Sequence, residues 1–95
     1  MAQPRITITI SDGELRVYIN PDGRDLLVKE LQHLSENSDH FHLGAWEGAE
    51  VELRSCPYDS KETLIEAVKI LFRPDDWDNQ YCPHVMLGGA SAKGP

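Results

Sequence analysis

The sequence contains little cysteine and no long hydrophobic run, and both shortages restrict the class of protein. Its two cysteines, Cys56 and Cys82, are too few for a disulfide framework, and we expect both to be reduced thiols. No apolar run approaches the roughly 20 residues that a membrane helix needs. The first residues lead directly into an alternating pattern, without the apolar segment of a signal peptide. We therefore expect a cytoplasmic protein without a membrane partner.

Basic residues are also scarce in this chain. Nine Lys and Arg stand against 16 Asp and Glu, which gives a formal net charge of −7. Such a surface repels phosphate backbones, so we expect no nucleic-acid partner. It attracts a basic protein and speeds their encounter. Negative charge also simply confers solubility, so the charge alone leaves both interpretations open.

The length and composition predict one globular domain. The chain has 95 residues, of which 40% are hydrophobic and 26% are charged. Two separate cores would each be too small to bury enough surface. We expect residues 1–87 to form a single domain and residues 88–95, which lack an apolar pattern, to be a flexible tail.

The N-terminal segment predicts a β-hairpin. Residues 5–11 alternate isoleucine with threonine, which predicts a strand with the isoleucines inward and the threonines outward. Residues 14–20 alternate in the same way through Leu15, Val17 and Ile19. Asp12-Gly13 between them is a strong two-residue turn signal. The two strands should pair antiparallel, with their apolar faces on the same side.

A helix is predicted after the hairpin, over residues 22–37. Leu27, Leu31 and Leu34 are spaced four and three apart, which forms an apolar stripe. We expect this stripe to lie across the apolar face of the hairpin. Two alternating segments then predict strands over residues 40–43 and 50–54. In the first of these, Phe41 and Leu43 should face inward and the two histidines outward.

Residues 63–73 fit two structures. Their apolar positions match a helical stripe, and they also match a strand over residues 68–72. Periodicity alone slightly favours the helix. Pro74 ends the element in both cases.

The chemistry-bearing residues include one arrangement compatible with a metal. The pair His40 and His42 should share a strand face, and Cys82 with His84 supplies two further zinc ligand types. This spacing matches no known zinc-finger pattern, and surface histidines with an unrelated cysteine explain it more simply. Neither cysteine lies near an orienting base in the sequence, and the nucleotide-binding and H-E-x-x-H motifs are absent from it. We expect no catalytic residue, no resident metal and no cofactor.

Two clusters of acidic residues surround tryptophans. One contains Asp75, Asp76 and Asp78 around Trp77, with Tyr81 close behind. The other, which is the secondary candidate, contains Glu47 and Glu50 after Trp46. A tryptophan with a charged rim is typical of a protein-binding hot spot, and the acids would steer a cationic partner. A solvated acidic face, with Trp77 folded back over the core, explains the first cluster equally well.

Two segments carry a resemblance to a known family. The stretch Asp39-His40-Phe41-His42-Leu43 is followed by Trp46 and Gly48, and a V-K-I strand pattern occurs within residues 64–74. Together they resemble the bacterial proteins of the immunity protein 32 type. The chain departs from that pattern in a shortened turn after Leu43, in Glu47 where the family pattern has glycine, and in the loop of residues 55–61.

The resemblance implies a structure and a function. It implies a strand over residues 68–72, and thus an α+β fold with a small antiparallel sheet, one main amphipathic helix packed on one face, and the order β-β-α-β-β-β. It also implies an immunity protein that binds and neutralises a cognate antibacterial toxin by covering its active site; a basic nuclease domain would complement the acidic charge. It carries over no catalytic residue.

Two alternative functions stay open at the level of sequence. One is a small metal-binding domain or enzyme that uses His40, His42, Cys82 and His84. The other is a self-associating structural or regulatory module, since a flat sheet edge is suited to a homodimer.

Overall fold

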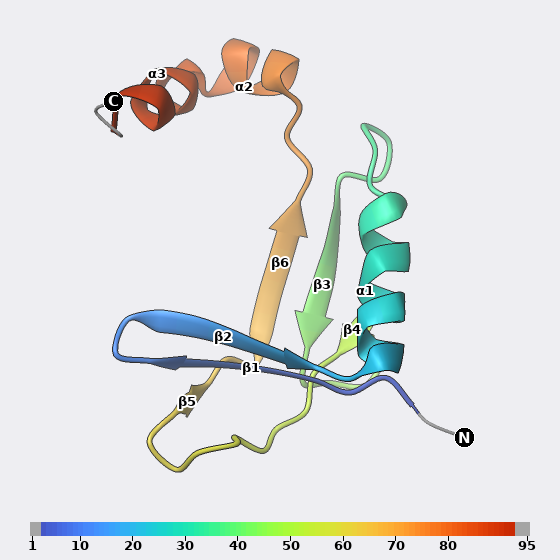
Figure 1. Cartoon of the computed structure of the whole chain (residues 1–95). Helices are drawn as coiled ribbons and strands as arrows, with labels where there is room; N and C mark the ends of the chain where they lie inside the picture. Colours follow the sequence, from blue (N-terminus) through green and yellow to red (C-terminus); the bar gives the residue numbers. More distant parts are fainter. Residues whose placement is uncertain (1–2, 93–95) are drawn as a thin grey trace.

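The computed structural model describes residues 3–92 (Figure 1). The chain forms six strands and three helices in this range. In order, they are β1 (Ile6–Ser11), β2 (Glu14–Ile19), α1 (Pro21–Gln32), β3 (His40–Gly44), β4 (Val51–Glu52), β5 (Thr63–Leu64), β6 (Ala67–Leu71), α2 (Asp75–Tyr81) and α3 (Pro83–Ala92).

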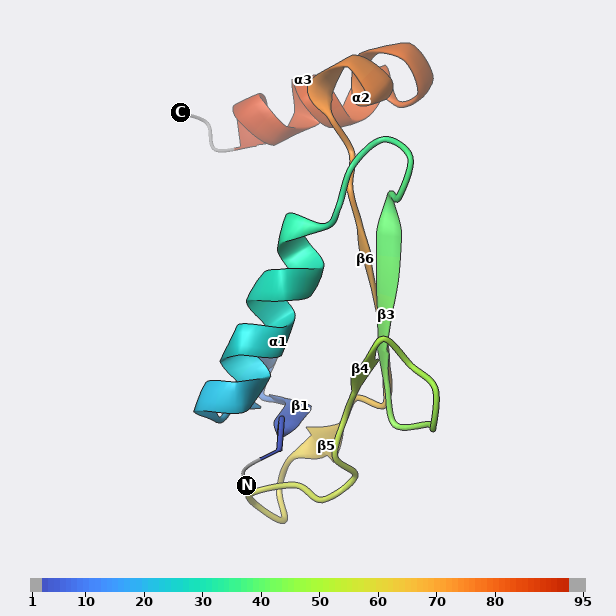
Figure 2. The ribbon, with the colours of Figure 1, turned by 90° about the vertical axis from the view of Figure 1, so that its right-hand side faces the viewer.

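The strands form two small sheets of three strands each. One has the order β2-β1-β5 and is antiparallel throughout. The other has the order β4-β3-β6, in which β3 pairs antiparallel with β6 but parallel with β4. Figure 2 shows α1 lying alongside the second sheet, above one end of the hairpin. The predicted α+β class is confirmed; the strands are divided between two sheets, and the β3–β4 pair is parallel because the chain loops back between them.

The predicted hairpin is confirmed together with its register. Ile8 is paired with Val17 and Ile10 with Leu15, which places the apolar residues of both strands on one side. Asp12 and Gly13 have φ angles of 53° and 77°. Both lie in the left-handed region that a type I′ turn requires, which explains why an Asp-Gly pair stands at this position.

The prediction that the β1 threonines face solvent is wrong. Thr7 and Thr9 are buried, as are Ile6 and Ile8. Because β1 is the central strand of its sheet, and the segment between β4 and β5 covers its second face, both faces of its first half are enclosed. The isoleucine face, in contrast, loses its cover toward the turn, where Ile10 is exposed.

Helix α1 begins and ends at capping residues. The Asn20 side chain accepts a hydrogen bond of 2.7 Å from the Gly23 backbone N–H, and Pro21 occupies the first helical position. The helix ends at Gln32, five residues before the predicted end. Leu26, Leu27 and Leu34 pack against the core, which includes the buried end of the hairpin, whereas Leu31 of the predicted stripe is exposed. The helix leaves the remainder of the hairpin's apolar face uncovered.

The core joins β1, β3 and the chain around β4. Phe41 and Leu43 are buried and the two histidines lie on the other face, as predicted. Among the described residues, the buried hydrophobic side chains are Ile6, Ile8, Phe41, Leu43, Val51 and Leu53. The strand alternative for residues 68–72 is confirmed, because β6 pairs with β3 over its whole length. The predicted fourth strand is shorter, with only Val51 and Glu52 in β4.

Two C-terminal helices were not predicted. After Pro74, the acids of the first turn stabilise the start of α2, and α2 packs chiefly against α3. Both helices project from the end of β6 (Figures 1 and 2). The backbone of α3 includes residues 88–92 of the predicted tail, and residues 93–95 lie outside the described range. Over residues 3–92, none of the helices combines the length and the apolarity needed to cross a membrane.

Candidate functional site

One hollow of the surface contains Trp46. It has a volume of about 740 Å³ and lies between the N-terminal segment, α1 and the chain around β4. Trp46 is 44% exposed. Three carboxylates line the hollow, from Glu47, Glu50 and Glu52, and Arg54 is the only Lys or Arg among its described lining residues. We call this feature the Trp46 hollow.

The Trp46 ring lies directly on the backbone of Gly44. A Cβ atom at Gly44 would be 1.9 Å from the nearest ring atom. The backbone is fixed on both sides of this contact, because the Leu53 N–H donates to the Gly44 carbonyl at 2.8 Å and the Ala45 N–H donates to the Glu66 carbonyl at 3.0 Å. Gly44 therefore provides the seat for the aromatic ring, at the end of the central strand.

Glu50 is held in its ionised form at this hollow. Its carboxylate accepts a hydrogen bond of 2.8 Å from the His42 backbone N–H and lies 3.6 Å from Nδ1 of the same residue. The backbone hydrogen bond is the main cause that lowers the pKa of the Glu50 carboxyl below its ordinary value. The negative charge therefore persists at neutral pH, which suits a cationic ligand group.

The Trp77 cluster lines a second hollow, with a volume of about 290 Å³. Of the predicted residues, Trp77, Asp76 and Tyr81 line it, whereas Asp75 and Asp78 do not. The Trp77 ring already has partners within the chain: the Arg73 guanidinium lies 4.2 Å from its centroid and the Tyr81 ring centroid lies at 4.8 Å. This tryptophan is consequently less available to a partner than Trp46.

The structure thus places five of the seven predicted binding residues in two separate hollows, and Asp75 and Asp78 in neither. Trp46, Glu47 and Glu50 line one, and Trp77 with Asp76 lines the other. The two hollows share no lining residue.

The four residues of the metal alternative are not brought together as a site. His40 and His42 form an edge-to-face pair with centroids 5.2 Å apart, and Nδ1 of His40 lies 2.9 Å from the Asp39 carboxylate. Cys82 and His84 lie at the junction of α2 and α3. Over residues 3–92, no group of three or more His, Cys, Asp or Glu side chains is arranged to hold a metal ion.

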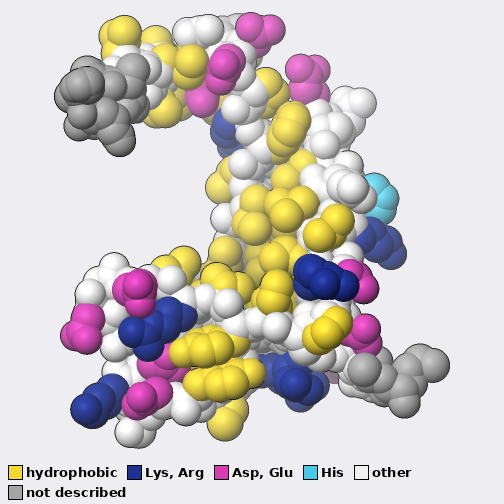
Figure 3. Space-filling view, viewed as in Figure 1, with side chains coloured by type: hydrophobic (Ala, Val, Ile, Leu, Met, Phe, Trp, Pro, Cys, Tyr) yellow, Lys and Arg dark blue, Asp and Glu magenta, His cyan; other side chains and the backbone are white. Residues whose placement is uncertain are grey.

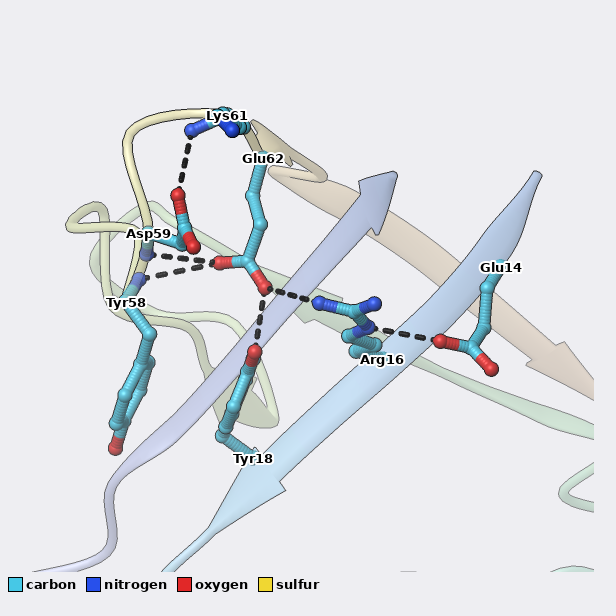
Figure 4. Close-up of polar contacts among 7 residues, drawn as sticks. All are labelled: Glu14, Arg16, Tyr18, Tyr58, Asp59, Lys61 and Glu62. Carbon is cyan, nitrogen blue, oxygen red and sulfur yellow. Dashed lines mark hydrogen bonds and ion pairs between the residues drawn. The ribbon is translucent and has the colours of Figure 1, made fainter. Parts of the chain in front are cut away.

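A buried carboxylate that the sequence did not reveal closes the loop between β4 and β5. Glu62 accepts hydrogen bonds from the Tyr18 hydroxyl and from the backbone N–H groups of Tyr58 and Asp59, both at 3.2 Å, and Arg16 lies 3.4 Å away (Figure 4). The Tyr18 and Tyr58 rings stack with centroids 4.0 Å apart. We call this network the Glu62 clasp. It fastens the loop to β2, across the face where Thr7 and Thr9 are buried.

We predict that the Glu62 clasp stabilises the fold only between two pH limits. The Tyr18 hydrogen bond is the main cause that lowers the pKa of Glu62 below its usual 4.5, so this contribution is present above pH 4.5 and is lost as the pH falls further. The Glu62 carboxylate raises the pKa of Tyr18 above 10, so the tyrosine contribution is present below pH 10 and is lost at higher pH.

The Glu62→Gln variant tests this window. At pH 7 its Tm should fall by about 5 to 10 °C, because the charged acceptor of several hydrogen bonds is lost. The difference from wild type should shrink below pH 4.5, where the native carboxylate is protonated. Glu66→Gln, at an exposed position, is the control. A difference that stays constant from pH 3 to pH 7 would contradict the assignment.

No family model matches the chain, and neither a curated protein nor a solved structure matches it.

Proposed function

We propose that this protein is an immunity protein, which binds a cognate antibacterial toxin and neutralises it by covering the active site. The Trp46 hollow is the proposed contact. The observation that carries the proposal is the arrangement there: an exposed tryptophan with three carboxylates and one arginine around a hollow of about 740 Å³. The resemblance of residues 39–48 to the immunity protein 32 type includes Trp46 and supports the same assignment.

The mechanism is occlusion rather than chemistry. A lysine or arginine of the toxin enters the hollow, where Glu47 and ionised Glu50 neutralise it and the Trp46 ring packs on its stem. Tryptophan is enriched at the centres of interfaces, and the net charge of −7 accelerates the encounter with a basic domain. A nuclease fits this role best, because its substrate cleft is cationic. The Trp77 hollow is a secondary contact.

Co-expression with a toxin domain tests the proposal. The toxin is the C-terminal domain encoded by the gene beside this one, expressed in a laboratory bacterium with and without this protein. Wild type should restore survival. Trp46→Ala should weaken binding to an inactivated toxin domain at least tenfold, since a central interface tryptophan typically contributes more than about 1.4 kcal/mol.

The carboxylates are tested by a charge-matched pair of variants. Glu47→Gln with Glu50→Gln should slow association and reduce its salt dependence. Asp75→Asn with Asp78→Asn removes the same charge from residues that line neither hollow and should leave protection intact. Equal loss in both double variants would show that only net charge matters. A toxin that kills equally with and without the wild-type protein would remove the immunity function for that pair.

A further inference from the structure

The chain exposes more surface than a compact monomer of its size. Its accessible area is 6864 Å², about 1,400 Å² more than a compact protein of its mass exposes. The radius of gyration is 15.9 Å, whereas a compact domain of this length has a value of about 12 Å. The molecule is therefore open in shape.

The openness is concentrated at one large hollow. Figure 3 shows it between the β1–β2 hairpin below and the α2–α3 pair above, with β6 at its back. Hydrophobic side chains gather on the hairpin side and over the sheet beside α1. Val68 and Ile70 of β6 belong to this region: they share the inner face of the sheet with Leu43 and Phe41, their partners on β3, but are only half-buried.

The hairpin presents an apolar face that the rest of the chain does not cover. This face begins at the buried residues Ile6 and Ile8, and the register continues it toward the turn. Its exposed large hydrophobics are Ile10 and Leu15 beside the turn, and Val17 and Ile19, which lie on β2 opposite the buried Ile8 and Ile6. Arg16 belongs to the opposite face with Thr9, so no charge interrupts the apolar strip. An uninterrupted apolar strip of this kind marks an interaction site.

The α2–α3 pair forms an arm in which α3 has a matching apolar character, whereas α2 carries Asp75, Asp76 and Asp78. The sequence of α3 contains no Asp, Glu, Lys or Arg, and the exposed Val85 side chain is apolar. The arm packs chiefly on itself rather than on the body of the molecule. An uncharged helix that stands away from its own core lacks the polar face of a surface helix.

We propose that a second copy of this chain fills the hollow, in a two-fold symmetric dimer in which each arm packs on the hairpin face of the partner. Both complementary surfaces belong to the same chain, so a single two-fold axis satisfies both at once. The excess area of about 1,400 Å² per chain matches what one partner buries in an obligate homodimer, about 1,000 to 2,500 Å². A basic toxin suits this surface less well, because the hairpin strip and α3 carry no acidic group.

This dimer is independent of the proposed toxin contact at the Trp46 hollow, whereas the secondary contact at Trp77 lies on α2 and therefore on the arm. The hairpin strip and Val85 share no residue with the lining of the Trp46 hollow. Loss of self-association and loss of toxin binding can therefore be measured separately.

Sedimentation velocity of the full chain tests the proposal. Wild type at 50 μM should sediment at twice the chain mass of 10.7 kDa. Val17→Asp should weaken self-association at least tenfold. Leu71→Asp is the matched control: it introduces the same charge at a similar exposure, 45% against 48%, on the histidine side of the second sheet, and should remain dimeric. Circular dichroism verifies that each variant is folded.

A charge-complementation experiment tests the arm exchange, in which each arm packs on the hairpin face of the partner chain. Val17→Lys and Val85→Glu should each abolish the homodimer, and Val85→Glu leaves the body of the fold untouched. When the two variants are mixed, they should form a heterodimer, because one arm contact is then native and the other is a Lys–Glu pair.

The outcomes separate the proposal from its rivals. A monomeric wild type overturns it, even if the toxin then binds the hairpin strip. A dimer that survives both Val17→Asp and Val85→Glu overturns the assigned surface. A dimer lost with Val17→Asp but kept with Val85→Glu shows hairpin-to-hairpin packing and overturns the arm exchange.

Discussion

Replacing Leu43 by alanine is expected to lower the free energy of unfolding by about 3 to 4 kcal/mol, which is the middle of the range for a buried leucine. Leu43 is 2% exposed and lies on the strand that joins β4 and β6. Removing three of its carbons leaves a cavity bounded by both neighbouring strands. Small domains are stable by about 5 to 15 kcal/mol in total, so the loss should reduce Tm by roughly 20 °C.

The measurement is urea denaturation followed by circular dichroism, at one fixed protein concentration because association shifts the apparent stability. Leu71→Ala provides the control, since it removes the same atoms from an exposed position two residues before Arg73. It should cost less than about 1 kcal/mol. Similar costs for the two variants would contradict the placement of the core on the inner face of β3.

The β-hairpin and β3 were predictable because their information is local. Alternation sets the side-chain period, and Asp12-Gly13 fixes the register by its positive φ angles. For β6, in contrast, local sequence does not decide between strand and helix. Its apolar spacing slightly favours a helix, and only pairing with β3 decides the structure. The resemblance, rather than the periodicity, favoured the correct alternative.

The incorrect burial predictions share one physical cause. An alternating pattern indicates that one face is apolar, but it does not say what covers either face. Thr9 is buried because the loop fastened by Glu62 lies over it, and that contact joins residues more than 40 positions apart. Val17 is exposed, although its pattern predicted burial, because α1 does not extend over this part of the hairpin face. The sequence identified the apolar strip of the hairpin correctly, but the prediction that the helix after it covers the whole strip was wrong.

The candidate site, like the fold, was only partly predictable from the sequence. The sequence indicated Trp46, Glu47 and Glu50 as one acidic aromatic cluster, and they line one hollow. The sequence ranked the Trp77 cluster first and this cluster second. We propose the opposite order, because Arg73 stacks on Trp77 and satisfies that tryptophan, whereas Trp46 packs on a glycine and stays partly open. The glycine carries no signal of its own in the sequence, because its function is to have no side chain.

Gly44→Ala is expected to cost about 2 to 3 kcal/mol of stability and to disrupt the Trp46 hollow at the same time. The new Cβ would lie 1.9 to 2.2 Å from three atoms of the Trp46 ring, far inside van der Waals contact. The backbone of Gly44 cannot retreat, because it is paired with β4 and β6 and with Leu53. The ring must therefore leave its seat, and forced overpacking of this kind typically costs about 1 to 3 kcal/mol.

A double-mutant cycle isolates this contact. The three atoms nearest to the added Cβ all belong to Trp46, so Gly44→Ala should cost less than about 0.5 kcal/mol when Trp46 is already alanine, which gives a coupling energy of about 2 kcal/mol. The same cycle measured on toxin binding should show that Gly44→Ala alone weakens binding as much as Trp46→Ala and adds nothing to it. If Gly44→Ala costs the same stability in both backgrounds, the ring does not rest on this glycine. If Gly44→Ala destabilises the protein but leaves toxin binding unchanged, the Trp46 ring does pack on Gly44, but the Trp46 hollow is not the toxin contact.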